Sequence, residues 1–161
     1  MTAEQYDRWT KPFRGKEPLV QKLNQMLTDL GWLMYPVLLL ALALKGDARL
    51  LRCILVPGVS FVLVTLVRRW INAPRPYEKL EIDPIIHKDT KGKSMPSRHV
   101  FSLFVIAMTY LWVWPVLGVI LLVLGVVLAG LRVIGGVHFP RDVLAGALCG
   151  IVSALVGYWL M

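Results

Sequence analysis

The sequence predicts an all-α integral membrane protein, a bundle of about five transmembrane helices with an amphipathic N-terminal helix in the membrane interface. Composition is the first reason, since 57% of the 161 residues are hydrophobic and only 17% are charged. Soluble domains contain about 25% charged residues. The second reason is that the apolar residues form five long runs, separated by polar or glycine- and proline-containing segments. The length fits one membrane domain over residues 1–161.

The domain begins with a mostly polar segment, residues 1–29, in which no cleavable signal peptide is visible. From residue 18 to residue 30 apolar side chains recur at helical spacing, namely Leu19, Val20, Leu23, Met26, Leu27 and Leu30. This pattern is typical of a short amphipathic helix that lies in the interface and does not cross it. The remainder, residues 30–161, is the expected transmembrane core.

The transmembrane core contains the five apolar runs. We expect helices over residues 30–44, 51–67, 99–114, 116–134 and 143–161. The first two runs are shorter than the roughly 20 residues that a spanning helix needs, so they have to include flanking residues. The polar segment 70–98 contains four prolines and should be mostly loop. Small residues along the fifth run predict close helix packing, namely Gly146, Gly150, Ala154 and Gly157.

Alternating helix directions bring several helix ends to one membrane face. They are the end of the second run, the start of the third, the end of the fourth and the start of the fifth, and the N-terminal segment lies on the same side. Aromatic residues agree with this topology, because Trp and Tyr favour membrane interfaces. We expect Trp112, Trp114, Tyr158 and Trp159 at the opposite interface, and Trp32, Tyr35, Trp70 and Tyr77 near the shared face.

Three polar clusters lie at this shared face. They are Arg68 with Arg75-Pro76, Pro96-Ser97-Arg98-His99, and Arg132 with His138 and Asp142. Basic residues at helix ends often extend to the lipid headgroups, which suits Arg69 and Arg141. That explanation does not account for two histidines and an aspartate among several arginines. Guanidinium groups match phosphate oxygens, so the clustered arginines indicate a phosphate-binding site.

Ser97 has two open roles. Its hydroxyl could donate to a bound phosphate, or it could cap the third helix. The backbone N–H groups at the start of that helix favour an anion in either case.

His138 and Asp142 are four residues apart. They share a helical face if the fifth helix begins near His138, whereas Pro140 between them favours a turn. A carboxylate bonded to one ring nitrogen makes the other nitrogen a better nucleophile. His99 would then serve as a general acid toward a leaving oxygen.

Other features predict no site. His87 lies in the polar segment without a matching partner and is expected to be solvated. Cys53 and Cys149 lie in apolar runs and are expected as unpaired packing residues. A metal site is disfavoured, because the surrounding arginines would repel a cation. The net charge of +8 fits anionic headgroups or an anionic substrate, and no nucleic acid partner is expected.

The three clusters resemble the signature of the type 2 phosphatidic acid phosphatase superfamily of membrane lipid phosphatases. That signature consists of a lysine, six residues and Arg-Pro; then Pro-Ser-x-His; then Ser-Arg, five residues, His, three residues and Asp. The matching residues here are Arg68 with Arg75-Pro76, Pro96-Ser97-Arg98-His99, and Arg132 with His138 and Asp142. The sequence departs from the pattern at Arg68, where lysine is usual, at Arg98, where glycine is common, and at Leu131, where serine is usual.

The resemblance implies a phosphatase that needs no cofactor and no metal. It implies that His138 takes the phosphoryl group as a phosphohistidine, that Asp142 orients His138, and that His99 protonates the leaving group and later activates water. The phosphate would be held by Arg68, Arg75, Ser97 and Arg132, with Arg98 as a further contributor. The short chain with its amphipathic N-terminus is most similar to the bacterial undecaprenyl diphosphate phosphatase branch. The implied substrate is a lipid phosphate or diphosphate, either a prenyl diphosphate or a glycerolipid phosphate.

Two alternatives remain at this point, a lipid phosphotransferase with the same intermediate and a non-catalytic protein that binds anionic lipid. Binding alone would need neither a nucleophile nor an acid, which counts against the second.

Two arguments disagree about the side of the membrane that the site faces. Of the 18 Lys and Arg, all but Lys45, Arg49 and Arg52 fall on the face of the site, so the positive-inside rule places the site in the cytoplasm. The resemblance instead implies the extracytoplasmic face of a bacterial cytoplasmic membrane. The oligomeric state is left open.

Overall fold

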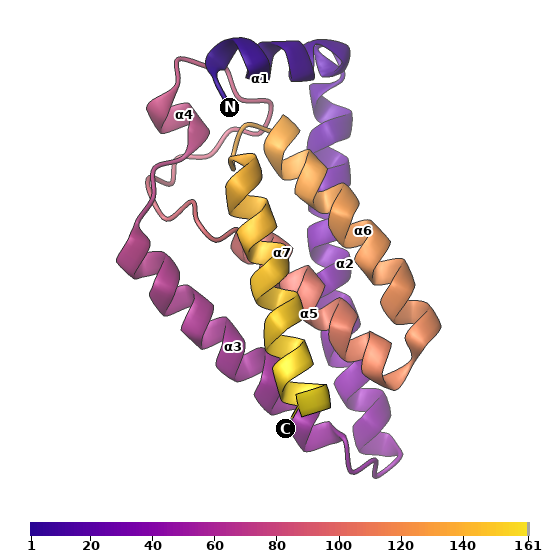
Figure 1. Ribbon diagram of the computed structural model, residues 1–161. Coiled ribbons are helices and arrows are strands. Elements are labelled where there is room, and N and C mark those ends of the chain that lie inside the picture. Colours follow the sequence, from indigo (N-terminus) through magenta and orange to yellow (C-terminus); the bar gives the residue numbers. More distant parts are fainter. Residues whose placement is uncertain (161) are drawn as a thin grey trace.

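The computed structural model describes residues 1–160, and every regular element in that range is helical (Figure 1). The elements in chain order are α1 (Ala3–Thr10), η1 (Lys11–Phe13), α2 (Glu17–Leu44), α3 (Leu50–Ile71), α4 (Pro76–Lys79), α5 (Arg98–Val113), α6 (Pro115–Ile134), α7 (Pro140–Leu155) and η2 (Val156–Leu160). The predicted all-α fold is confirmed. Residue 161, where the fifth expected helix ends, lies outside the described range.

Local sequence explains where the helices begin and end. Prolines occupy the first position of α4, α6 and α7, where their missing N–H is not needed and their fixed φ suits the helix. Helix α3 ends at Ile71, and the next residue, Asn72, has a left-handed φ of 42°, as is usual after a helix C-terminus. Helix α1 begins with a capping box, in which Thr2 and Gln5 exchange side-chain to backbone hydrogen bonds.

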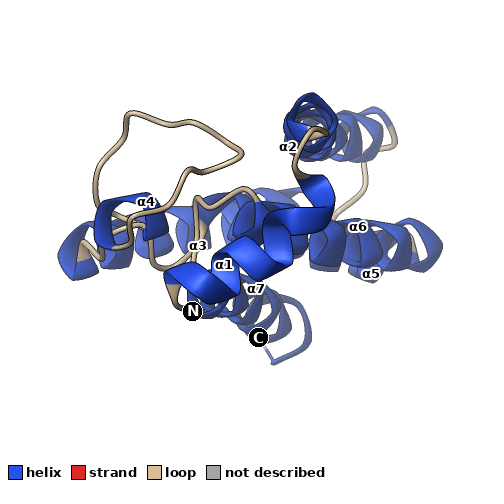
Figure 2. Ribbon diagram, turned by 90° about the horizontal axis from the view of Figure 1, so that it is seen from above, coloured by secondary structure: helices blue, strands red, loops and turns tan. Residues whose placement is uncertain are grey.

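Helix α5 is the centre of the bundle. Of its 16 residues, 11 are buried, and it packs along both α6 and α7. Helices α2 and α3 flank this group (Figures 1 and 2). The close α5–α7 contact depends on small residues of α7. A Cβ at Gly146 would lie 2.5 Å from the Ser97 carbonyl oxygen, and one at Gly150 would lie 2.9 Å from the Phe101 carbonyl oxygen.

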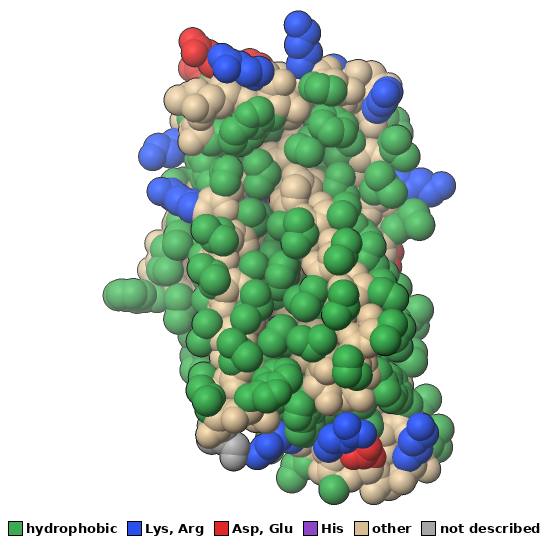
Figure 3. Space-filling view, turned by 45° about the vertical axis from the view of Figure 1, so that its right-hand side comes forward, with side chains coloured by type: hydrophobic (Ala, Val, Ile, Leu, Met, Phe, Trp, Pro, Cys, Tyr) green, Lys and Arg blue, Asp and Glu red, His purple; other side chains and the backbone are tan. Residues whose placement is uncertain are grey.

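The protein is an integral membrane protein. Four helical segments are long and apolar enough to cross a membrane, namely Glu17–Leu44, Leu50–Lys79, Pro115–Ile134 and Pro140–Leu160. Helix α5 is shorter and also apolar, and its burial among the other helices makes it the fifth member of the bundle. Figure 3 shows the apolar side chains as a broad band between two charged ends.

One expectation about the first helix is wrong. Residues 18–30 do not form a separate amphipathic helix, because α2 continues without a break from Glu17 to Leu44. The helix that lies across the end of the bundle is α1 (Figure 1). Because α2 begins at Glu17, Trp32 and Tyr35 lie near its middle and not at its end as expected, and both line an apolar cavity between α2, α3 and α5. The expectation that residues 1–29 as a whole lie in the interface remains a prediction.

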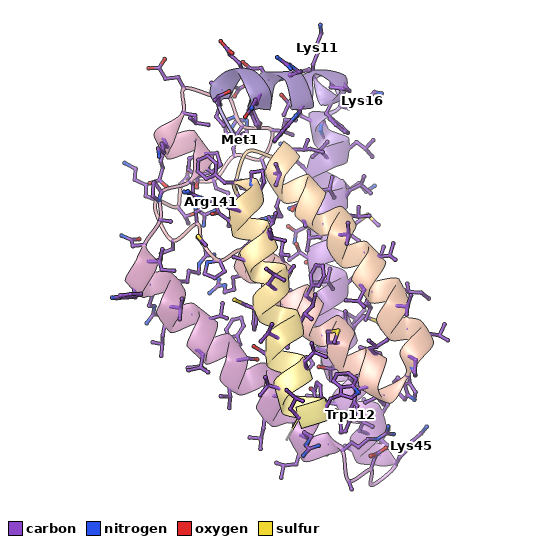
Figure 4. The ribbon with its side chains drawn as sticks, viewed as in Figure 1. Met1, Lys11, Lys16, Lys45, Trp112 and Arg141 are labelled. Atoms are coloured by element: carbon purple, nitrogen blue, oxygen red, sulfur yellow. The ribbon has the colours of Figure 1, made fainter. Side chains whose placement is uncertain are left out.

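The opposite end of the bundle agrees with the predicted aromatic cluster. The Trp112 and Tyr158 rings stack with centroids 4.7 Å apart. The Lys45 ammonium lies 5.8 Å from the Trp114 ring centroid, and the Arg49 guanidinium lies 5.9 Å from that of Trp112. Figure 4 shows Lys45 and Trp112 together at this end, with Lys11 and Lys16 at the other.

The connecting segment (residues 72–97) joins α3 to α5 and contains α4. The N-terminal elements hold its outer part: the Ile85 N–H donates to the Tyr6 hydroxyl at 3.2 Å, and the Gln21 amide donates to the Ile85 carbonyl at 2.7 Å. Arg14 pairs with Asp83 at 3.0 Å. The turn after α6 packs against Tyr6, since a Cβ at Gly136 would lie 2.8 Å from the Tyr6 hydroxyl. The φ of Gly136 is +72°, a conformation that also favours glycine at this position. Together these contacts cover one end of the bundle.

Candidate active site

The three polar clusters converge at the N-terminal ends of α5 and α7, and one hydrogen bond joins each pair of clusters. The Arg68 guanidinium donates to the Pro96 carbonyl at 2.6 Å. The Arg75 guanidinium donates to the Val137 carbonyl at 3.3 Å, next to His138. The Ser97 N–H donates to the Asp142 carbonyl at 2.8 Å. The structure therefore brings together residues that lie up to 74 positions apart in the sequence.

Six of the expected site residues are buried, with at most 9% of their surface exposed. They are Arg68, Arg75, Ser97, Arg132, His138 and Asp142. Burial of charged groups is costly unless partners or a ligand compensate. Three buried guanidinium groups accompany a single buried carboxylate, that of Asp142, among the described residues. This excess of positive charge favours an anionic ligand.

Asp142 occupies a fixed position in the first turn of α7. Its Oδ2 accepts the Phe139 N–H at 2.9 Å, which satisfies one of the free N–H groups at the start of the helix. His138 lies just before this helix, so the local geometry is a turn and not a continuous helical face. The His138 Nδ1 is 3.8 Å from Asp142 Oδ2, which is an ion-pair distance but too long for a hydrogen bond.

A serine lies between these two side chains. The Ser94 hydroxyl donates to Asp142 Oδ2 at 2.5 Å and lies 3.3 Å from His138 Nδ1. Ser94 is fully buried. The expected direct contact between the carboxylate and the imidazole is therefore replaced by a contact through a hydroxyl.

Two buried donors at the site have no hydrogen-bond partner within residues 1–160. They are the Ser97 Oγ and the Arg132 Nε. Ser97 is the residue before α5, yet its side chain makes no capping hydrogen bond, so of its two open roles the structure favours that of a free donor. A buried donor without an acceptor is costly, and a bound oxyanion would remove that cost.

The environment of His138 favours its neutral form. Burial lowers the pKa of His138 from its ordinary 6.5 to about 4, and the guanidinium groups of Arg132, Arg75 and Arg68 act in the same direction. The carboxylate of Asp142 opposes this shift and does not cancel it. The imidazole is therefore uncharged at neutral pH, as a nucleophile must be.

His99 lies where two cavities meet. An apolar cavity of about 270 Å³ lies between α2, α3 and α5 and is lined by Trp32, Phe61, Leu103 and His99, among others. A polar cavity of about 410 Å³ lies between α2 and the connecting segment, where His99 and Arg132 face Lys88, Asn24 and His87. His99 is thus accessible from an apolar and a polar side. The expectation that His87 is exposed is confirmed.

Arg98 differs from the other arginines of the signature. Its side chain is exposed, and its guanidinium lies over the Phe61 ring, 5.7 Å from the centroid. It lines the apolar cavity together with His99. The structure therefore places Arg98 on the apolar side of the site, apart from the buried arginine cluster.

Three residues near the site were not predicted as members of it. Ser94 lies within the polar stretch before α5, but it is outside the motif that matches the family signature, so the sequence predicted no role for it. Asn24 accepts a hydrogen bond from the Arg132 guanidinium at 3.2 Å. The one feature of the sequence that could have indicated this contact is that Asn24 is a polar residue within an apolar helical pattern. Lys88 lies in the polar cavity, where burial and the nearby arginines, Arg132 first, lower its pKa to about 8.

Comparisons with known proteins agree with the motif pattern. The sequence is 39% identical over 66 residues to the bacitracin transport permease protein BcrC of Bacillus licheniformis, covering 41% of this chain and 32% of the relative. It is 43% identical over 65 residues to the putative undecaprenyl-diphosphatase YbjG of Escherichia coli strain K12, covering 38% of this chain and 32% of the relative. These alignments therefore span about a third of each curated relative.

Two crystal structures resemble the whole chain. One is Aquifex aeolicus LpxE, with a TM-score of 0.75 and 25% identity over 97% of this chain and 93% of that one. The other is the first transmembrane PAP2 type phosphatidylglycerolphosphate phosphatase from Bacillus subtilis, with a TM-score of 0.58, 23% identity and coverage of 94% and 90%, a likeness in fold alone. The model of the PAP2 superfamily matches residues 49–161, which include all three polar clusters. The chain belongs to the PAP2 superfamily.

Proposed function

We propose that this protein is a membrane lipid phosphatase that hydrolyses a lipid phosphate or diphosphate through a phosphohistidine on His138. The observation that carries the proposal is the arrangement around this side chain. A neutral buried imidazole lies among buried arginines, and Ser97 Oγ and Arg132 Nε, two donors that find no acceptor within residues 1–160, lie in the same site. Donors placed in this way stabilise the charge of a phosphoryl group during transfer.

In the first step, His138 Nε2 attacks the phosphorus atom and the bond from phosphorus to the leaving oxygen breaks. His99 donates a proton to that oxygen, so the dephosphorylated lipid leaves in its protonated form. In the second step, His99 accepts a proton from a water molecule, whose oxygen attacks the phosphohistidine. Inorganic phosphate is released and His138 is regenerated. Arg68, Arg75, Ser97 and Arg132 hold the phosphoryl oxygens in both steps.

The two cavities at His99 support a lipid substrate and hydrolysis. The apolar cavity suits the chain of a lipid leaving group, and the polar cavity suits the approach of water. A prenyl diphosphate is one candidate, since YbjG is named as a putative undecaprenyl-diphosphatase. A glycerolipid phosphate is the other. Water access also favours hydrolysis over transfer to a second lipid acceptor.

No metal ion takes part in the proposed reaction. The positive charge that a metal would supply to the phosphoryl oxygens comes here from Arg68, Arg75 and Arg132. The site is proposed to face the extracytoplasmic side of a bacterial cytoplasmic membrane.

The test is phosphate release from lipid phosphates by the purified protein in detergent, with and without excess chelator. We expect His138→Ala to lose at least about 10³-fold in kcat, because it removes the nucleophile. Ser60→Ala is the control and should keep full activity, because the Ser60 hydroxyl donates to the Val56 carbonyl within α3 and lines neither of the two cavities at His99. A ³²P label should be trapped on the wild type and not on His138→Ala. Full activity of His138→Ala would overturn the phosphohistidine, and loss of wild-type activity in chelator would overturn the metal-free mechanism.

A further inference from the structure

We propose that Ser94 is a positioning residue of this site, whose hydroxyl connects Asp142 to His138 and sets the tautomer of the imidazole. The inference rests on the proposed role of His138 as the nucleophile. Ser94 lies two residues before the Pro-Ser-x-His motif and is not part of the matching signature.

The distances show that the hydroxyl occupies the place where a direct contact was expected. Ser94 Oγ is 2.5 Å from Asp142 Oδ2 and 3.3 Å from His138 Nδ1. The direct distance between Nδ1 and Oδ2 is 3.8 Å, beyond hydrogen-bond range. All three side chains are at most 1% exposed, so bulk water does not compete for these contacts.

The hydrogen-bonding capacities of the three groups fix the direction of each contact. The Asp142 carboxylate can only accept, so Ser94 donates its single hydroxyl proton to Oδ2. The hydroxyl oxygen can then only accept from His138, which requires the proton to be on Nδ1. Nε2 is left with a free lone pair, as attack on phosphorus requires. With the opposite tautomer, the lone pairs of Nδ1 and Oγ would face each other at 3.3 Å.

The backbone around Ser94 is well anchored. The Ser94 N–H donates to the Ala73 carbonyl at 2.9 Å, which ties it to the end of α3. The Arg68 guanidinium donates to the Pro96 carbonyl, two residues further on, at 2.6 Å. Asp142 Oδ2 is held separately by the Phe139 N–H at 2.9 Å. The hydroxyl is therefore fixed from the side of α3 and the carboxylate from the side of α7, and their contact locks the two together.

The first test is the ¹⁵N NMR spectrum of the imidazole nitrogens in the wild-type protein, labelled at histidine and purified in detergent. His138→Gln identifies the signals of His138 by their loss. We expect Nδ1 to be protonated and Nε2 to be unprotonated at neutral pH. A protonated Nε2 with a bare Nδ1 would overturn the proposal without any need for a Ser94 variant. This result does not depend on turnover, so it separates a failure of the inference from a failure of the proposed function.

The second test compares Ser94→Ala with Ser94→Thr, which keeps the hydroxyl. We expect Ser94→Ala to lower kcat roughly 10- to 100-fold with little change in KM, and its ¹⁵N signals to show a mixture of tautomers. Ser60→Ala is the matched control, since it removes another buried serine hydroxyl at a distance from the site. Ser94→Thr should recover most of the lost kcat; if it does not fold, the spectrum of Ser94→Ala decides. Wild-type kcat and a single tautomer in Ser94→Ala would show that Ser94 only fills space.

Discussion

At the scale of single residues, the candidate site combines three buried guanidinium groups with two buried donors that find no acceptor within residues 1–160. Arg68 and Arg75 donate to backbone carbonyls, and Arg132 donates to Asn24. These partners are neutral, so with the Asp142 carboxylate as the single buried anion among the described residues an excess of positive charge remains available to an anion. Ser97 Oγ and Arg132 Nε are two further buried donors, and neither has a hydrogen-bond partner within residues 1–160. The fold therefore holds the donors in place before any anion binds, and little reorganisation would be required on binding.

The titration of His138 follows from the same environment. Burial lowers the pKa of His138 to about 4, so the imidazole loses its proton well below the ordinary value of 6.5 and is neutral above about pH 5. In the proposed mechanism the neutral form is the nucleophile, so acidification toward pH 5 should not remove it. We expect an NMR pH titration of histidine-labelled protein to give a midpoint near 4 for His138, assigned by loss of its signal in His138→Gln. A midpoint at or above 6.5 would contradict the buried, neutral nucleophile.

The sequence predicted the members of the site better than their contacts. Motif spacing pointed to Arg68, Ser97, His138 and Asp142, and the structure brings these residues together. It could not show the Ser94 hydroxyl between imidazole and carboxylate. The spacing of His138 and Asp142 is compatible with direct contact, whereas in the structure α7 begins at Pro140 between them and the two side chains are 3.8 Å apart.

At the scale of helices, the boundary of α2 was the main failure, and its cause is physical. Polar residues at positions 21, 24, 25 and 28 form one stripe of a helix, and they line the polar cavity. An interfacial helix with one face toward water has the same pattern. Periodicity alone cannot distinguish water outside the protein from a polar cavity within it. The contact between Asn24 and Arg132, 108 positions apart, was equally hidden from local patterns.

The packing of α5 against α7 gives a prediction at this scale. A Cβ at Gly146 would lie 2.5 Å from the Ser97 carbonyl oxygen, and the adjacent bond from the Ser97 N–H to the Asp142 carbonyl is 2.8 Å long. Gly146→Ala should therefore push the start of α5 away from α7, destabilise the protein by about 1–3 kcal/mol and lower kcat/KM by tenfold or more.

Gly130→Ala in α6 is the matched control, because nothing lies within 4 Å of its Cβ position. Thermal unfolding in detergent and phosphate release should both remain at wild-type level in this variant. If Gly146→Ala behaved like Gly130→Ala in both measurements, the close approach of the two helices would not be what positions Ser97.

At the scale of the whole molecule, the two ends of the apolar band carry different kinds of charge. The end with Lys45, Arg49 and Arg52 has basic residues next to Trp112 and Trp114, an arrangement typical of a membrane interface. At the site end, Arg68, Arg75 and Arg132 are buried and point into the protein. These three do not face headgroups, so they carry less weight in the positive-inside rule than their number suggests. Charge counting therefore overstates the case for a cytoplasmic site.

Labelling of single cysteines in intact bacterial cells tests the proposed orientation. In a background without Cys53 and Cys149, Ala48→Cys places a thiol at the exposed turn between α2 and α3, and Glu81→Cys places one on the connecting segment beside the site. A membrane-impermeant maleimide should modify Glu81→Cys in intact cells and Ala48→Cys only after permeabilisation. The two thiols should differ because the α2–α3 turn and the connecting segment lie at opposite ends of the bundle (Figure 1), and the proposed orientation places the connecting segment outside. The reverse pattern would place phosphate release in the cytoplasm, as the unweighted charge count does.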